Sequence, residues 1–389
     1  MFHVKHPRRG VSVEDIELLR PPRRFGALAL LVLAASSILL SACAGIASPK
    51  GWASPVLTGD LLLAAHQDRL FALDAETLER RWEFPTPGGA DDIDIVALYG
   101  TPAVTGATVF LPTFDGALYA LDLESGDVLP GWPFETEGPI IGGIVVAQDT
   151  VYFGDDDGKV YALDATSGLP RWAEPFQTGD AVWSVPTLVG DTLYVTSLDG
   201  HLYALDAATG RERWSFEANA GIASPPVVDE AAGLIYIGGL DSRLRAIDKE
   251  THDERWSRGA DNWFWTRPLV EDGVVYAGSL DNNVYAFDAA SGEPRWPQPF
   301  LTEEPIRSAP VIVDGVLIVI DRKGNVYGIN PDDGLLSIQG PLVLNSDVLS
   351  DPLVRDGTSE VIIVTTDGEL VRIDANTLQV LERRALKDN

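Results

Sequence analysis

A sixteen-residue stretch recurs along this chain at nearly constant spacing. It reads DGKVYALDATSGLPRW at 157–172, DGHLYALDAATGRERW at 199–214 and DSRLRAIDKETHDERW at 241–256. A period of this length indicates one small structural unit that buries its apolar face only against neighbouring copies. The anchor residue that ends the ALD-like tripeptide occurs eight times, with spacings of 48, 42, 42, 42, 40, 42 and 44 residues: Asp74, Asp122, Asp164, Asp206, Asp248, Asp288, Asn330 and Asp374.

Each unit has room for four short strands. In one copy, WSVPTLVG (183–190), DTLYVTSLDG (191–200), HLYALDAAT (201–209) and GRERWSFEAN (210–219) are rich in Val, Leu, Tyr and Thr and are separated by Gly- or Asp-containing turns. Four strands in about 42 residues are typical of a propeller blade, whereas solenoid repeats rarely hold so many. The sequence therefore predicts an all-β, eight-bladed β-propeller of four-stranded antiparallel blades over residues 52–389.

The repeated letters have structural roles. Glycine stands four residues after five of the anchors, where a tight turn needs positive φ, whereas Leu78, His252 and Leu378 replace it in the other copies. The anchor carboxylate can accept a hydrogen bond from the turn backbone two residues on. Tryptophan follows eight residues after the anchor in five copies: Trp82, Trp172, Trp214, Trp256 and Trp296.

This D-x-x-(S/T)-G-x-x-x-W pattern resembles the tryptophan-docking motif of the pyrroloquinoline quinone (PQQ)-dependent dehydrogenase superfamily. The resemblance implies that each indole packs between adjacent blades, where its large apolar area joins two sheets. Trp132 arrives two residues late, and the last two copies carry Ile338 and Glu382 instead. How these blades dock, and how the ring closes, is left open by the pattern.

The N-terminal segment is predicted to be an export signal outside the fold. Basic residues precede an apolar run of 15 residues, GALALLVLAASSILL, which ends at Ser-Ala-Cys43. Cys43 is the only cysteine, and its setting resembles a bacterial lipoprotein lipobox. We expect a signal peptide at 1–42, a lipidated Cys43 with a short linker at 43–51, and a membrane-bound, exported protein. The alternative is an uncleaved anchor in which Cys43 has no special role.

Composition excludes some functions. The net charge of −29 and pI near 4.4 disfavour binding to nucleic acid and favour cations or basic partners. No catalytic motif, phosphate loop or metal-ligand spacing is present, so no enzyme, cofactor or metal is predicted. A reduced quinoprotein that binds PQQ or Ca²⁺, or an envelope protein that binds a small ligand or a cation, remains the alternative. The chain lacks the cysteine pair and long insertions that the resemblance to quinoproteins would imply.

Function in a repeat protein is expected where the copies differ, on the loops of one face. The residues that enter each innermost strand should ring the funnel mouth, and four of the eight are aromatic. The turns between second and third strands, which face the same way, carry carboxylates in six blades. Trp, Tyr and Arg are enriched at binding hot spots. The candidate partner-binding mouth comprises Trp52, Tyr99, Trp183, Trp263, Trp265, Arg307, Asp115, Asp157, Asp199, Asp241, Asp281 and Asp367.

The lipobox, eight blades and lack of a catalytic set together resemble the BamB family, propeller lipoproteins of the outer-membrane β-barrel assembly machinery. The resemblance implies a monomeric, non-catalytic scaffold that binds an envelope protein through loops on one face. It also presumes a cell with an outer membrane. In a single-membrane bacterium, the same chain would face outward as a lipid-anchored binding module.

Overall fold

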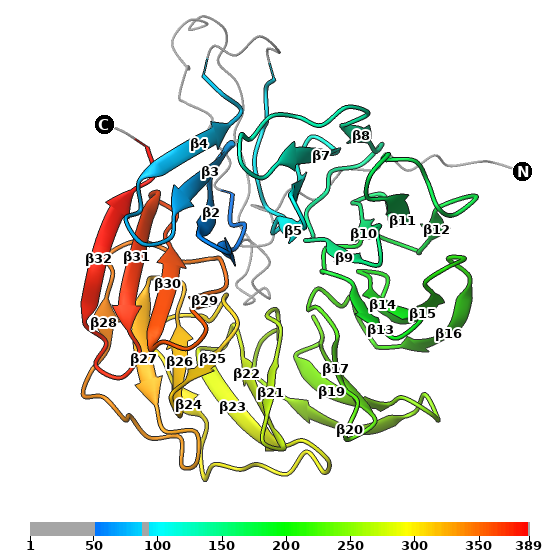
Figure 1. Ribbon diagram of the computed structural model, residues 1–389. Coiled ribbons are helices and arrows are strands. Elements are labelled where there is room, and N and C mark those ends of the chain that lie inside the picture. Colours follow the sequence, from blue (N-terminus) through cyan, green and yellow to red (C-terminus); the bar gives the residue numbers. More distant parts are fainter. Residues whose placement is uncertain (1–50, 88–92, 388–389) are drawn as a thin grey trace, which may run out of the picture. The chain divides into compact units, whose positions relative to one another are not determined.

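A computed structural model describes residues 51–87 and 93–387, and it confirms the predicted fold class (Figure 1). Every described residue belongs to one compact unit, Ser48–Asn389. In that unit, eight four-stranded sheets follow one another around a ring. The predicted signal peptide and Cys43 lie outside the described residues. Within these ranges, no helix is long and apolar enough to cross a membrane.

Every blade is built from four consecutive antiparallel strands, and the blades are numbered 1 to 8 in chain order. The first strand of each blade lies nearest the centre of the ring, and those of blades 2 to 6 contact one another in turn (Figure 1). These innermost strands are β1 (Val56–Thr58), β5 (Ala103–Thr105), β9 (Val145–Ala147), β13 (Thr187–Val189), β17 (Val227–Asp229), β21 (Leu269–Glu271), β25 (Val311–Val313) and β29 (Leu353–Val354). The second strands are β2 (Leu61–His66), β6 (Thr108–Pro112), β10 (Thr150–Gly154), β14 (Thr192–Thr196), β18 (Leu234–Gly238), β22 (Val274–Gly278), β26 (Val316–Ile320) and β30 (Glu360–Val364).

The third strands end at or next to the anchor residue, and the fourth strands form the rim. The third strands are β3 (Arg69–Asp74), β7 (Ala117–Asp122), β11 (Lys159–Asp164), β15 (His201–Asp206), β19 (Arg243–Asp248), β23 (Asn283–Asp288), β27 (Asn325–Ile329) and β31 (Glu369–Asp374). The fourth strands are β4 (Arg80–Phe84), β8 (Phe134–Glu135), β12 (Phe176–Gln177), β16 (Glu212–Glu217), β20 (Glu254–Gly259), β24 (Phe300–Leu301), β28 (Leu342–Val343) and β32 (Val380–Ala385). A proline directly precedes each two-residue rim strand, and it shortens the ladder because it has no N–H to donate.

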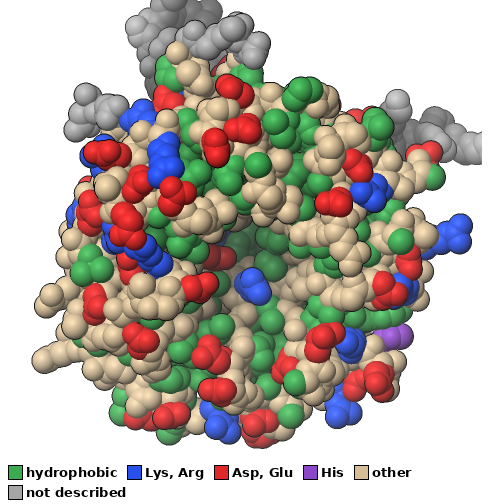
Figure 2. All heavy atoms as spheres, viewed as in Figure 1, with side chains coloured by type: hydrophobic (Ala, Val, Ile, Leu, Met, Phe, Trp, Pro, Cys, Tyr) green, Lys and Arg blue, Asp and Glu red, His purple; other side chains and the backbone are tan. Residues whose placement is uncertain are grey.

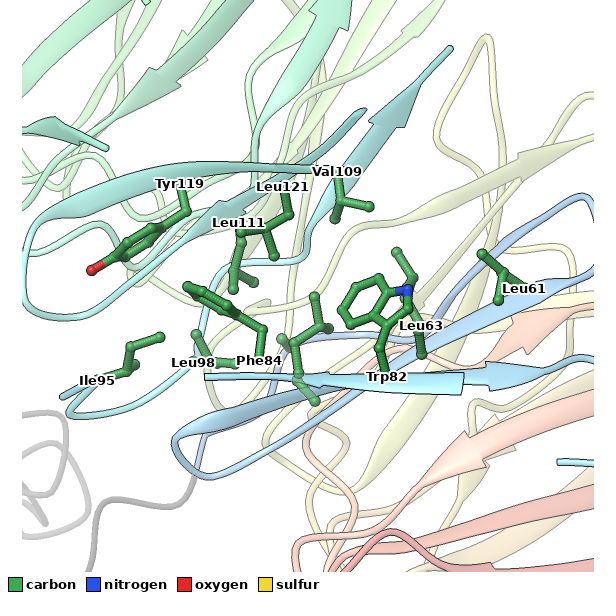
Figure 3. Close-up of a cluster of buried hydrophobic side chains, with 14 of the residues drawn as sticks. Leu61, Leu63, Trp82, Phe84, Ile95, Leu98, Val109, Leu111, Tyr119 and Leu121 are labelled. Atoms are coloured by element: carbon green, nitrogen blue, oxygen red, sulfur yellow. The ribbon is translucent and has the colours of Figure 1, made fainter. Parts of the chain in front are cut away.

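The apolar core lies between blades. One cluster joins blades 1 and 2, where Trp82 on β4 points towards Val109 and Leu121 of the next sheet (Figure 3). Equivalent clusters fill the other interfaces, with strand residues alternating between the two faces of each blade. Both faces of a blade are therefore covered by neighbours, which explains why the second and third strands are almost continuously buried.

At four interfaces, the tryptophan of one blade forms a hydrogen bond to the backbone of the next blade. Trp256 donates its indole N–H to the carbonyl of Ala289 in the next blade at 2.9 Å, and the indole face lies against Gly292. A Cβ on Gly292, which has φ of +70°, would lie 2.6 Å from the ring. The same bond to the next blade is made by Trp82 (to Leu123), Trp172 (to Ala207) and Trp296 (to Pro331). The turn glycine thus also provides a flat surface for the preceding blade's indole.

Where the tryptophan of one blade or the turn glycine of the next blade is replaced, the residue at the facing position also differs or compensates. Trp214 faces His252 instead of glycine, and the two rings stack at 4.3 Å. Where blade 7 has Ile338 in place of tryptophan, blade 8 has Leu378 in place of glycine, and both join one core cluster. Where blade 8 has Glu382, blade 1 has the fully buried Leu78. A leucine therefore occupies the space that a missing indole would leave, which answers how the last blades dock.

The ring closes without any strand exchange between the termini, because β1–β4 and β29–β32 form separate blades. An apolar cluster joins them, with Leu62, Phe71 and Leu78 packing against Ile362 and Leu370. Charged groups reinforce the seam outside this cluster. Arg355 pairs with Glu76 of blade 1, and Arg372 bonds the Glu76 carbonyl at 3.1 Å while also pairing with Glu360 and Glu382.

Candidate binding mouth

Two sets of loops share the predicted mouth face. In seven blades, the turn between second and third strands donates a backbone hydrogen bond to the loop that enters the same blade, as Leu198 does to Ala181 and Leu280 to Trp263. Equivalent bonds run from Phe114, Asp156, Leu240, Arg322 and Thr366. The turn carboxylates and the residues before the innermost strands therefore lie on one face of the ring.

Five of the predicted mouth residues meet across the opening. The rings of Trp52 and Tyr99 contact each other at a tilt of 55°, with their centroids 4.3 Å apart. The Arg307 guanidinium lies over Trp52 at 5.7 Å and over Trp265 at 4.5 Å. Trp265 in turn contacts Trp183 at 6.1 Å. These residues come from blades 1, 2, 4, 6 and 7, and the contacts between blades 1 and 7 and between blades 6 and 4 each skip one intervening blade. We call Trp52, Tyr99, Trp183, Trp265 and Arg307 the mouth belt.

Small residues next to the belt allow the inner strands to approach closely. A Cβ on Gly100 would lie 2.3 Å from the carbonyl oxygen of Gly142, and a Cβ on Gly142 would lie 2.6 Å from that of Ser184. Any larger residue would separate the blades at this level. The small side chains predicted at the strand starts therefore let neighbouring loops bring their large side chains together over the channel.

Next to the belt, hydrogen bonds link the loops of neighbouring blades across the junction of blades 8 and 1. The backbone N–H of Ala309 donates to the Asp351 carboxylate at 2.7 Å, that of Asp351 to the Ser54 hydroxyl at 3.0 Å, and that of Ser54 to Thr101 at 3.2 Å. Burial raises the pKa of Asp351, whose surroundings also include the Arg267 charge. This series runs through blades 7, 8, 1 and 2 and holds the entry point of Trp52 in place.

Three of the six turn carboxylates are held by contacts within the protein, two of them with a mouth loop. Asp199 accepts bonds from the Gly179 N–H at 2.6 Å and the Tyr203 hydroxyl at 2.6 Å. Asp281 repeats this with Asp261 and Tyr285. Asp241 instead pairs with the buried Arg245, which replaces the tyrosine. These carboxylates therefore hold their own blades and the loops that carry Trp183 and Trp265.

The other three turn carboxylates, Asp115, Asp157 and Asp367, are exposed. Asp367 accepts a bond from the Ser346 hydroxyl at 2.9 Å. In blade 3, the Tyr161 hydroxyl donates its hydrogen bond to Asp155, which lies two residues before Asp157. Asp157 therefore does not bind the tyrosine of its blade. These three exposed groups and the exposed loop residues Asp94, Asp180, Asp261 and Glu303 place negative charge on the mouth face.

Two contributors were not anticipated from the sequence. Asp156 accepts the indole N–H of Trp183 at 2.6 Å, and burial raises the pKa of this carboxyl. Phe114 packs edge-on against Tyr99 at 5.2 Å. Both occupy the position just before the turn carboxylate, where the other blades carry leucine, histidine, arginine or threonine, so no residue type repeated at this position indicated them.

The aromatic residues beside Trp265 differ in role. Trp263 is half-buried at the loop, and its carbonyl accepts a backbone hydrogen bond from Leu280, whereas the neighbouring Phe264 is buried in the core against Tyr285. On the face that Figure 2 shows, the centre of the ring is hollowed, and hydrophobic side chains and a basic group are visible within it. Acidic side chains are spread over the surface around the hollow.

The belt is suited to contact rather than to catalysis. Its rings and guanidinium offer apolar area and planar donors, which are the groups that dominate binding energy at protein interfaces. Across residues 51–87 and 93–387, no three His, Cys, Asp or Glu side chains gather as a metal site would require. The acidic surroundings favour the approach of a basic partner through long-range attraction.

Comparisons with known proteins place these observations in a family. A family model described as "Outer membrane protein assembly factor BamB" matches residues 42–184, 130–229, 174–262 and 223–384. The crystal structure of BamB from Moraxella catarrhalis is similar, with a TM-score of 0.68 and 20% identity over 82% of this chain and 92% of that chain. No curated protein sequence matches.

The structural likeness by itself shows the fold alone. The computationally designed Ika8 protein is equally similar, with a TM-score of 0.68 and 13% identity over 85% of this chain and 96% of that chain. The family model instead compares amino-acid sequences, and its overlapping matches extend over nearly the whole propeller. A propeller of eight docking repeats, together with this match, shows that the chain belongs to the family of the outer membrane protein assembly factor BamB.

Proposed function

We propose that this protein is a lipid-anchored, non-catalytic scaffold that binds a protein partner in the cell envelope during outer-membrane protein assembly. The mouth belt is the observation that carries the proposal. Two tryptophans, Trp183 and Trp265, are brought within 6.1 Å from non-adjacent blades, and Arg307 joins them to Trp52. A row of this kind across the channel offers a platform for a partner's side chains.

The partner is expected to be a basic protein segment. Exposed carboxylates around the belt would steer such a segment, and the rings would supply the contact area once it arrives. Asp199 and Asp281 act as positioning residues, because they hold the loops that present Trp183 and Trp265. Lipidation of Cys43 would keep the scaffold at the membrane where its partner works.

Removal of the belt tests the proposal. The lipidated protein would be solubilised from membranes, mildly cross-linked and used to capture its envelope partner. Replacing Trp183, Trp265 and Arg307 together with alanine should abolish capture while leaving the melting temperature nearly unchanged. The matched control replaces Leu169, Leu335 and Arg211, which are similar in type but exposed elsewhere, and should capture the partner normally.

The same preparation separates the scaffold from a reduced quinoprotein. A stoichiometric envelope protein without a quinone absorbance supports the scaffold. A bound quinone or Ca²⁺ with no partner would overturn it. Loss of folding in the belt variant would assign Trp183, Trp265 and Arg307 to the core instead.

A further inference from the structure

The chain enters the propeller through the mouth face. Gly51, the first described residue, is pressed against loops on that face, because an added Cβ would lie 2.2 Å from the Leu98 carbonyl oxygen and 3.0 Å from that of Gln67. The next residue, Trp52, is part of the belt that crosses the opening. The N-terminal tether of the propeller therefore departs from the mouth and not from the rim or the opposite face.

The tether is short. Eight peptide steps separate Cys43 from Gly51, and a fully extended chain spans at most about 3.3–3.6 Å per residue, which gives a reach of about 26–29 Å. If Cys43 carries the lipid, the mouth must stay within this distance of the membrane surface.

This reach is insufficient for the opposite orientation. If the mouth pointed away from the membrane, the tether would first have to run from the channel to the rim. It would cross four strands spaced about 4.8 Å apart, a distance of roughly 15 Å without the rim side chains. It would then descend past strands of up to six residues, a further distance of about 20 Å before turns are added. The path of about 35–40 Å exceeds the tether, so the mouth could not point away from the bilayer.

We infer that the mouth belt is the membrane-facing surface of the anchored protein, and that it receives a basic segment of a membrane-embedded protein where that segment leaves the bilayer. This inference rests on the proposed function and on lipidation of Cys43. The acidic surroundings disfavour flat contact with anionic lipid within a screening length of about 8–10 Å. The tether is longer than that length, and the remaining space between mouth and bilayer accommodates the partner's segment.

Energy transfer to lipid tests the orientation. The full lipidated protein would be placed in phosphatidylethanolamine–phosphatidylglycerol vesicles that contain a headgroup-labelled acceptor lipid. A donor dye would be attached at a single introduced cysteine, Asp115→Cys on the mouth face or Ala107→Cys on the opposite face. Both positions are exposed and belong to blade 2, so their radial positions are matched.

We expect several-fold greater transfer from position 115 than from position 107. A Gly/Ser insert of about 20 residues between Lys50 and Gly51 should remove the difference, because it lengthens the flexible tether by about 25 Å. Equal transfer, or greater transfer from position 107, with the native tether would overturn the inference, and so would failure of the lipidated protein to associate with vesicles. Partner capture is measured separately, so its failure would refute the proposed function and leave the orientation result standing.

Discussion

Exchange of one docking pair for another gives a quantitative test of how the blades are joined. At the interface of blades 5 and 6, Trp256 lies on Gly292; at the interface of blades 7 and 8, Ile338 and Leu378 hold the equivalent positions. If each pair is a unit, Trp256→Ile and Gly292→Leu should each be damaging alone and should compensate one another when combined.

The structure sets the magnitude of each step. Gly292→Leu places a Cβ 2.6 Å from the indole, so the ring must shift and its 2.9 Å bond to the Ala289 carbonyl weakens. Overpacking costs about 1–3 kcal/mol and a lost buried hydrogen bond about 1–3 kcal/mol, which gives roughly 3 kcal/mol together. Trp256→Ile leaves a cavity and an unpaired carbonyl and should also cost about 3 kcal/mol.

In the double variant, the leucine enters the space that the indole vacates, as Leu378 does beside Ile338. The left-handed backbone does not forbid it, since Leu78 and Leu378 have φ of 55° and 54°. We expect a total loss of about 3–4 kcal/mol instead of about 6, which is a coupling of about 2–3 kcal/mol. Urea unfolding followed by circular dichroism would measure it, with the m-values compared between variants. A double-variant loss equal to the sum of the single losses within about 0.5 kcal/mol would refute the pairing.

Three further predictions concern the seam, the buried phenols and the mouth loops. Glu360→Gln, at a residue only 6% exposed between Arg372 and Arg355, should lower the free energy of unfolding by about 3 kcal/mol. The exposed pair of Glu369 and Arg383 is the control, and Glu369→Gln should cost less than about 1 kcal/mol in the same urea titration. The second prediction concerns alkaline pH. Burial raises the pKa of Tyr327 to about 12, so the folded state favours the neutral phenol. Its contribution is complete below the unfolded pKa of about 10 and is lost as the pH rises towards 12. Tyrosinate absorbance and circular dichroism should therefore change together in that window, and phenol ionisation at pH 10 without unfolding would contradict it. Finally, Asp281→Ala should weaken partner capture by loosening the loop before Trp265, whereas Asp115→Ala should alter mainly its salt dependence; equal effects would remove the positioning role.

The sequence alone determined the architecture. A 42-residue period, four turn-bounded apolar segments per copy and an Asp–Gly–Trp spacing specify a propeller, because these signals are local and the unit recurs eight times, although the glycine and the tryptophan each stand at their motif position in only five copies. The positive φ at the turn glycines and the packing of the tryptophans between blades could be predicted from the same repeated residues. The class of loop that forms the mouth could also be predicted, since strand direction alternates along the chain.

The tertiary structure decided which side chains meet and which are merely structural. Trp183 and Trp265 are separated by about two repeats in the chain, and their contact depends on the curvature of the ring. The turn carboxylates look alike in sequence, yet Asp199 and Asp281 bind tyrosines while Asp115 and Asp157 face outward. A repeat pattern encodes contacts between neighbouring copies, whereas contacts such as that of Trp183 with Trp265 join blades that are not neighbours and depend on how the ring curves, and for that physical reason they cannot be read from any single copy.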